Sequence, residues 1–327
     1  MPLQDDYAAI REGAAIGSVA PRAQIAVSGI DRASYLQGLL TNDIQSLTAG
    51  RGCYAAWLTP QGRMLTDMHV LESGTLILMD VPAQQATATL ERLEQFIFTE
   101  DVRVGSMADA MTGVWLHGPR APEVLQRVLD GAQNLAGWDD YRHMPLQFRD
   151  EPVSTARIDQ LGVPGYCVYI EQGREAMLIE TLIQAGAATV GSDALQAARI
   201  EAGYPVFGSD MTETTIPLEA GIEDRAISFS KGCYVGQEVI IRVLHRGGGR
   251  VARKLVGLRI QGNAVGRGKL FSGTREIGEI TSAADSPRLG PIALGYLHRD
   301  FVTPGTQVEV AVEGSRTPSI VTARPMT

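Results

Sequence analysis

Cysteine is scarce in this chain, with three residues among 327: Cys53, Cys167 and Cys233. An odd number without any Cys-x-x-Cys pair argues against a disulfide framework, so each thiol has to be considered singly. The five histidines show no His-x-x-x-His or His-x-His spacing that would place two ligands on one face. We therefore expect no dedicated metal site.

Long apolar runs are also missing, because none approaches the roughly 20 residues that a membrane helix requires. The first twenty residues carry Asp5, Asp6 and Glu12 without a continuous apolar core, so we expect neither a secretory signal nor a transit peptide. Basic residues number 29 against 37 acidic ones, and the net charge of -8 repels phosphate backbones and anionic membranes. These features predict a cytoplasmic protein with no membrane partner and no direct nucleic-acid partner.

What the chain does contain is the composition of a globular protein. Hydrophobic residues make up 44% of it and charged residues 20%, unlike disordered or fibrous sequences. A length of 327 residues exceeds the usual size of one domain and predicts two or three compact units.

The first predicted unit opens with a β-prone segment at 24–28, a turn at Gly29 and a helix. Leu36 and Leu39 lie three residues apart and belong to one apolar helix face. Further strands are predicted at 53–58, 64–71 and 75–81, followed by an amphipathic helix across 84–98. This order of elements indicates an α+β fold.

A second unit begins in a similar way. Gly29 precedes Leu36-Gln37 by the same interval as Gly118 precedes Leu125-Gln126, which suggests two related αβ units. From residue 251 the pattern changes to short strands separated by Gly, Pro and Asn, typical of a small β-barrel or sandwich. We interpret the run 246–250, Arg-Gly-Gly-Gly-Arg, as a linker. The predicted domains are 1–112, 113–247 and 248–327.

The most specific segment covers residues 231–238 and reads Lys-Gly-Cys-Tyr-Val-Gly-Gln-Glu. In this run the chain resembles the YgfZ-type folate-binding proteins, which are related to the glycine-cleavage T-protein, an aminomethyltransferase. Further segments resemble blocks of the same family on both sides of the run: 41–44, 61–63 with Asp67, 199–205, 217–221, 278–282 and 293–296. The resemblance therefore covers nearly the whole chain.

This resemblance implies a fold, a cofactor and a role. The expected fold is α+β, with two related ferredoxin-like αβ units and a C-terminal β-barrel as three lobes around a central opening. The expected cofactor is tetrahydrofolate or another reduced folate. The implied role is that of an accessory protein that supports iron-sulfur cluster assembly or repair in client enzymes, including a tRNA-modifying one, so its partners would be folate and iron-sulfur client or assembly proteins.

The resemblance also names candidate folate contacts. A pterin carries its N–H donors on one edge, where a fixed carboxylate can accept them, and the resemblance gives this role to Glu201. The alternative is that Glu201 is a solvated glutamate on a helix surface. Within the basic stretch that follows, Arg225, Lys231 and Arg242 are candidates to attract the anionic folate tail. The same site would include two residues of the 231–238 run, Tyr234 and Gln237.

Two further residues are candidates for chemistry. Cys233 lies near Lys231 in the sequence and could act as a nucleophile or redox group, or it could be an ordinary buried thiol. The resemblance aligns Asp67 with a T-protein loop that carries paired aspartates after two glycines. Here Arg63 and Thr66 replace one glycine and one aspartate. The loss of one acid argues against ordinary glycine-cleavage chemistry, although Asp67 could still orient a ligand.

Two alternative functions remain beside the accessory role. One is a folate-dependent aminomethyl or one-carbon transferase, which requires a second substrate next to the folate. The other is an interaction scaffold that retains a vestigial folate pocket.

Overall fold

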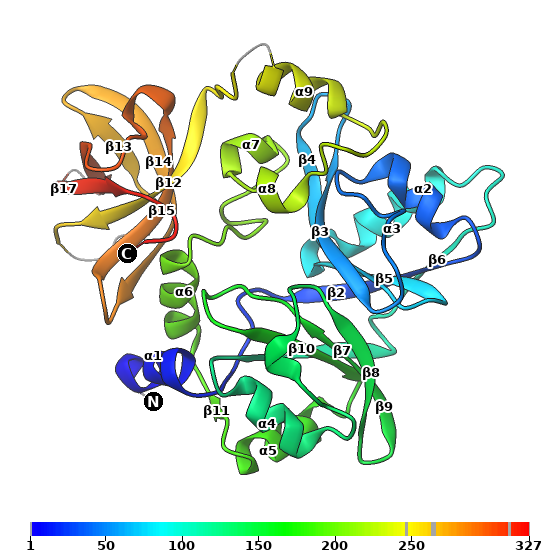
Figure 1. Ribbon diagram of the computed structural model, residues 1–327. Helices are drawn as coiled ribbons and strands as arrows, with labels where there is room; N and C mark the ends of the chain where they lie inside the picture. Colours follow the sequence, from blue (N-terminus) through cyan, green and yellow to red (C-terminus); the bar gives the residue numbers. More distant parts are fainter. Residues whose placement is uncertain (1, 246–247, 263–265, 313–314, 327) are drawn as a thin grey trace.

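The computed structural model describes residues 2–245, 248–262, 266–312 and 315–326. It contains two β-sheets with their helices and a separate closed barrel, which form three lobes in Figure 1. The predicted α+β class with a C-terminal barrel is therefore confirmed. The predicted linker and the boundary at 247/248 involve residues 246–247, which lie outside the described residues.

The first unit is a five-stranded antiparallel sheet in the order β3-β4-β5-β2-β6. Its helices pack against one face of the sheet, where Leu36, Leu93 and Trp57 are buried together. The elements are β2 (Arg22–Ser28), α2 (Arg32–Leu39), β3 (Arg51–Leu58), β4 (Met64–Glu72), β5 (Leu76–Pro82), η1 (Ala83–Gln85), α3 (Ala86–Gln95) and β6 (Arg103–Ser106).

The second unit is a six-stranded sheet in the order β11-β1-β7-β10-β9-β8. Its elements are α1 (Leu3–Glu12), β1 (Ala15–Ile16), β7 (Met111–His117), α4 (Ala121–Val128), η2 (Leu135–Gly137), β8 (His143–Phe148), β9 (Glu151–Arg157), β10 (Gly165–Glu171), α5 (Glu175–Gln184) and β11 (Ala188–Thr189). The start of the chain thus joins this unit, because β1 pairs with β7 and β11. The boundary that we predicted at 112/113 falls inside β7.

The two sheets share a buried core. Tyr54, Ala56 and Leu58 alternate along β3 on the face away from the helices, and they cluster with Trp115 and Tyr169 of the second sheet. Because both faces of the first sheet are covered, eight of the nine residues of β4 are buried. Polar side chains on this strand therefore lie inside the protein, where each needs a partner.

Both units begin a helix after a glycine with positive φ. Gly29 has φ +104° and precedes α2, and Gly118 has φ +118° and precedes α4. A Cβ on Gly29 would lie 1.9 Å from the Asp101 carbonyl oxygen, and one on Gly118 would lie 2.4 Å from that of Gly13. Glycine is required at both turns because only it combines this φ with so close a backbone approach.

A helical connection leads from the second sheet to the barrel. It comprises α6 (Ser192–Glu201), α7 (Pro217–Ala220), α8 (Glu223–Ala226) and α9 (Gln237–His245). In Figure 1, α6 lies between the barrel and the lower lobe, whereas α9 lies beside the upper lobe. The connection therefore contacts all three lobes.

The barrel closes in the order β12-β15-β14-β13-β16-β17, because the last strand pairs with the first. Inward-facing aliphatic side chains such as Leu258, Leu270 and Val310 fill its interior. The elements are β12 (Arg253–Ile260), β13 (Lys269–Ser272), β14 (Arg275–Ser286), β15 (Gly290–His298), η3 (Arg299–Phe301), β16 (Gln307–Val312) and β17 (Ser315–Thr322).

Candidate functional site

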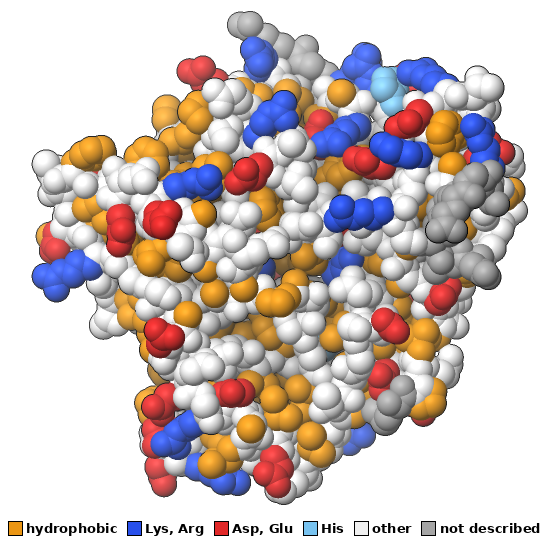
Figure 2. Space-filling model, turned by 180° about the vertical axis from the view of Figure 1, so that it is seen from behind, with side chains coloured by type: hydrophobic (Ala, Val, Ile, Leu, Met, Phe, Trp, Pro, Cys, Tyr) orange, Lys and Arg blue, Asp and Glu red, His pale blue; other side chains and the backbone are white. Residues whose placement is uncertain are grey.

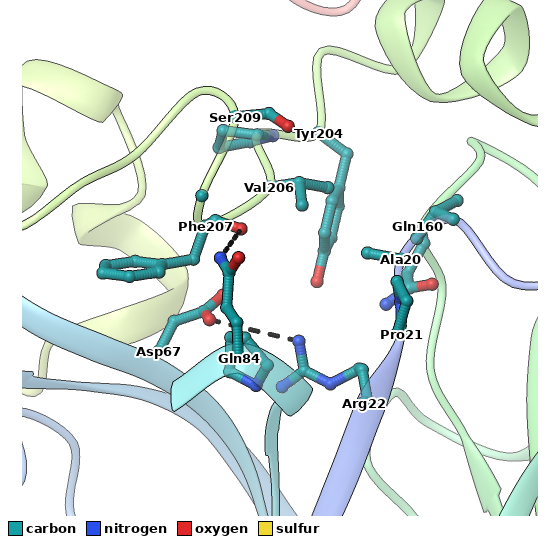
Figure 3. Close-up of a pocket in the computed structure, with 14 residues that line it drawn as sticks. Ala20, Pro21, Arg22, Asp67, Gln84, Gln160, Tyr204, Val206, Phe207 and Ser209 are labelled. Carbon is teal, nitrogen blue, oxygen red and sulfur yellow. Dashed lines mark hydrogen bonds and ion pairs between the residues drawn. The ribbon is translucent and has the colours of Figure 1, made fainter. Parts of the chain in front are cut away.

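A cavity of about 190 Å³ lies where the two sheets meet the segment that follows α6. In Figure 3, the side chains of Arg22, Asp67, Gln84 and Tyr204 point toward a common space. The cavity lining comes from the loop before β2, from β4, from the end of β5 with η1, from the loop after β9 and from residues 204–209. Segments distant in the sequence therefore build one site.

Asp67 is the carboxylate of this cavity. Its side chain comes from β4 and is 2% exposed. The Tyr54 hydroxyl donates to Oδ2 at 2.6 Å, whereas Oδ1 has no hydrogen-bond partner among the described residues and lies 4.0 Å from Nη1 of Arg22. An unpaired buried carboxylate oxygen is costly, so Oδ1 is suited to accept a hydrogen bond from a ligand.

Arg22 is held in place by a second buried acid, Asp80 on β5. The Arg22 Nε lies 2.6 Å from Asp80 Oδ2, His69 Nδ1 lies 2.9 Å from the same oxygen, and Gln24 donates to Oδ1 at 2.8 Å. Burial opposes ionisation of Asp80, but Arg22 and the hydrogen bond from His69 outweigh it and lower the Asp80 pKa. Burial, aided by Arg22, lowers the pKa of His69 and so favours its neutral form.

Tyr204 forms the opposite wall. Its ring lies beneath the Arg225 guanidinium, at 4.3 Å, and the same guanidinium lies 4.8 Å from the Tyr54 ring centroid. Burial raises the pKa of Tyr204, although Arg225 and a hydrogen bond from Gln160 act in the other direction. The Tyr204 hydroxyl therefore keeps its proton, and Arg225 lies behind the cavity wall.

The site combines hydrogen-bond acceptors and donors around a small cavity. Asp67 Oδ1 and Gln160 Oε1 are buried acceptors without a partner among the described residues, and both side chains line the cavity. Arg22 supplies a cation on the same surface. This arrangement suits a flat polar heterocycle that carries several N–H groups, and a reduced pterin is such a group.

The structure places Glu201 away from this cavity. Its carboxylate is 1% exposed and accepts hydrogen bonds from Tyr7, Arg11, Ser286 and Arg288, among them a 2.7 Å bond from the Tyr7 hydroxyl. These partners belong to α1 and to the barrel, so the carboxylate joins the second unit to the barrel. Glu201 is neither a solvated surface residue nor a neighbour of Asp67.

Lys231 is a buried link between the 231–238 run and the first unit. Its ammonium donates to the backbone carbonyl oxygens of Gln37, Leu40 and Asn42 at 2.7, 2.7 and 2.8 Å. Tyr234 packs beside it, with the Lys231 Nζ 5.1 Å from the ring centroid. Lys231 therefore fixes the loop and does not present its charge to the cavity.

We expect Lys231→Met to lower the free energy of unfolding by about 2 kcal/mol, because it leaves carbonyls at the end of α2 without their donor. Urea unfolding of the variant measures this loss. Lys254→Met, which removes a lysine from the barrel edge, is the matched control, and a loss of the same size there would contradict the assigned role.

The remaining predicted residues are dispersed. Cys233 and Arg242 are exposed, and Gln237 begins α9. Tyr234 is 7% exposed and belongs to the core between the two sheets. Asp67 and Arg225 are linked by Tyr54, whose hydroxyl donates to Asp67 and whose ring lies under the Arg225 guanidinium. Arg225 also lies over the ring of Tyr204. Neither Cys233 nor Arg242 belongs to the cavity lining.

Sequence reasoning did not name as site residues Arg22, Gln84, Gln160 or Tyr204, which line the cavity, nor His69 and Asp80, which lie behind Arg22. A signal was present for Asp80, which is the single polar residue in the apolar strand β5, since a buried polar residue is more informative than an exposed apolar one.

Comparisons with known proteins agree with this architecture. Residues 2–231 match the family model described as the GCVT N-terminal domain, and residues 253–327 match the glycine cleavage T-protein C-terminal barrel domain. The chain belongs to the T-protein family. Among its relatives in this family, an aminomethyltransferase of Streptomyces coelicolor is 30% identical, with 99% of this chain and 91% of the relative covered. An aminomethyltransferase of Synechococcus sp. is 28% identical over 99% and 90% of the two chains.

A solved T-protein structure has the same fold. The crystal structure of glycine cleavage system aminomethyltransferase T from Bartonella henselae superposes with a TM-score of 0.88 at 23% identity, covering 99% of this chain and 89% of that one. The three-lobed arrangement is therefore the T-protein fold.

One face of the protein carries charges of both signs. Figure 2 shows Lys and Arg interspersed with Asp and Glu on the face that it presents. In the part of the chain that the structure describes, no helix has the length and apolarity needed to cross a membrane.

Proposed function

We propose that the protein binds tetrahydrofolate, with its pterin in the Asp67 cavity, and acts in folate-dependent aminomethyl transfer. The buried Oδ1 of Asp67, which lines the cavity and has no hydrogen-bond partner among the described residues, carries this proposal. The relatives named aminomethyltransferase and the family match support the reaction class. The bound folate would supply a ring nitrogen that accepts the one-carbon unit.

The residues of this chain would bind and orient that folate. Asp67 Oδ1 accepts an N–H of the pterin, and Arg22 offers a donor to its carbonyl edge. Arg22 forms a buried ion pair with Asp80, which holds the guanidinium in place. The site therefore does not have to reorganise when the ligand enters.

Anaerobic calorimetric titration with tetrahydrofolate tests binding, and single-turnover formation of methylene-tetrahydrofolate from an aminomethyl donor tests transfer. We expect both signals from the wild-type protein. Binding without transfer would refute the transferase role and leave the folate site in place, whereas no binding would refute the folate site.

One observation favours a second function, the accessory role in iron-sulfur cluster assembly or repair implied by the YgfZ resemblance. Cys233 is exposed on a loop that Lys231 anchors to three backbone carbonyls, so the thiol is held at the surface where a partner protein can reach it. Cys233→Ser would then reduce the activity of an iron-sulfur client enzyme in cells while tetrahydrofolate binding in vitro stays unchanged. Normal client activity in that variant would refute this role for the thiol.

A further inference from the structure

A larger cavity, of about 590 Å³, lies between the two sheets at their edge strands β3 and β8. At this place the His143 amide N–H donates to the Gly50 carbonyl oxygen at 3.0 Å, which joins the two edges (Figure 1). Among the described residues, the lining shares no member with that of the Asp67 cavity. The larger cavity is therefore a separate site.

His143 is the buried polar residue of this larger cavity. Its side chain lines the cavity and is 4% exposed, and its Nε2 atom has no hydrogen-bond partner among the described residues. A buried imidazole nitrogen without a partner is costly, so Nε2 is suited to a hydrogen bond with a ligand. Burial lowers the pKa of His143 to about 4, although Glu72 acts in the other direction, which favours the neutral ring at pH 7.

Two arginines line the same cavity. The Arg51 guanidinium pairs with Asp139 at 3.0 Å, so its charge is already balanced. The Arg142 guanidinium lies 5.4 Å from the ring centroid of Trp138, and no acid among the described residues forms an ion pair with it. The cavity therefore offers one uncompensated cation, in a fork that matches the two oxygens of a carboxylate.

The apolar part of the lining comes from both sheets. Leu71 belongs to β4 of the first sheet, and Met144 and Pro145 belong to β8 of the second. A volume of about 590 Å³ falls within the range of small-molecule sites. The lining thus combines room for an apolar body with one free positive charge and one buried imidazole.

We propose that this cavity binds a small aromatic monocarboxylate. Its ring would pack against Leu71 and Met144, and its carboxylate would accept hydrogen bonds from the Arg142 guanidinium and from an N–H on His143 Nε2. A phosphate dianion fits less well, because Asp139 already balances the second arginine and would leave one negative charge without a partner. Such a ligand would contact both sheets at once.

The test titrates the full-length protein, prepared with isotope-labelled histidine, and follows the imidazole signals by NMR. The probe is naphthoate, and naphthamide is the uncharged probe of the same shape. His143→Gln identifies the His143 signal among those of the five histidines. Arg142→Gln removes the free cation, and Arg120→Gln, which replaces a 59% exposed arginine outside the cavity lining, is its matched control. Thermal unfolding checks that both arginine variants are folded.

We expect naphthoate to move the His143 signal until it saturates, with a dissociation constant at least about tenfold lower than that of naphthamide. Arg142→Gln should raise the naphthoate dissociation constant about tenfold, and Arg120→Gln should leave it unchanged. A His143 signal that stays in place while naphthoate is added would overturn the proposal. An unchanged dissociation constant in the folded Arg142→Gln variant, or tighter binding of naphthyl phosphate than of naphthoate, would also overturn it. None of these outcomes bears on the proposed folate site.

Discussion

Asp67→Asn should weaken tetrahydrofolate binding by about 30-fold, corresponding to ~2 kcal/mol for a charge-assisted hydrogen bond. The replacement has the same shape, and the Tyr54 hydroxyl can still donate to its remaining oxygen at the position of Oδ2. The amino group then takes the place of Oδ1 and turns a donor toward the N–H groups of the pterin. The amide N–H and the pterin N–H would then face each other as two donors, and the acceptor that the pterin N–H needs would be missing.

Anaerobic titration of the purified variant measures this effect, and Asp139→Asn is its matched control. Asp139 is 79% exposed and pairs with Arg51 at the surface, so its replacement changes the net charge by the same amount without touching the cavity. The control should bind tetrahydrofolate like the wild type. Equal affinity of Asp67→Asn and the wild type would show that the cavity is not the folate site.

Glu201→Gln should lower the free energy of unfolding by about 2 kcal/mol, the range for hydrogen bonds to a charged group, because the carboxylate is buried while Arg11 and Arg288 remain 23% and 49% exposed. The glutamate is 1% exposed and lies between Arg11 of α1 and Arg288 of the barrel, with both guanidinium groups bonded to Oε2 at 2.8–3.0 Å. An amide carries no charge to balance them, and it places an N–H group among donors. We expect the contact between the second unit and the barrel to weaken first.

The same variant decides between two interpretations of Glu201. If it is a structural residue, the folded variant binds tetrahydrofolate within about twofold of the wild type, below the effect of one hydrogen bond. If it holds the pterin, as the family resemblance implies, binding is lost while the protein is still folded. Glu238→Gln, which replaces an exposed glutamate at the start of α9, controls for the charge change and should alter neither property.

Local sequence signals predicted most elements because each depends on neighbouring residues. The strand predicted at 64–71 falls within β4, and the helix predicted across 84–98 contains α3, where apolar residues follow the helical period. The turns at Gly29 and Gly118 could be predicted for the same reason, since a positive φ is a local property of the backbone. The sequence did not show which strands pair with each other. The predicted first unit, 1–112, therefore included β1, although β1 pairs with β7 of the second unit.

The sequence predicted only part of the candidate site. Asp67 was found through a motif, because the resemblance preserves the order of residues along the chain. Its partners come from distant segments, as Arg22 and Gln160 show, and no spacing in the sequence brings them together. Glu201 illustrates the opposite case, since the motif was present but its environment depends on how α1 and the barrel pack around it.

By itself the sequence determined the α+β class and a C-terminal β unit through hydrophobic period and turn chemistry. The resemblance of its motifs supplied the barrel and the relation to the T-protein family, because motifs keep their order along the chain. The tertiary structure alone decided which polar groups share one buried volume. That outcome depends on the packing of two sheets face to face, which buries His69 and Asp80 and forces each to find a hydrogen-bond partner. The role of a buried polar residue is thus set by its partners in space, and those partners are not its neighbours in the chain.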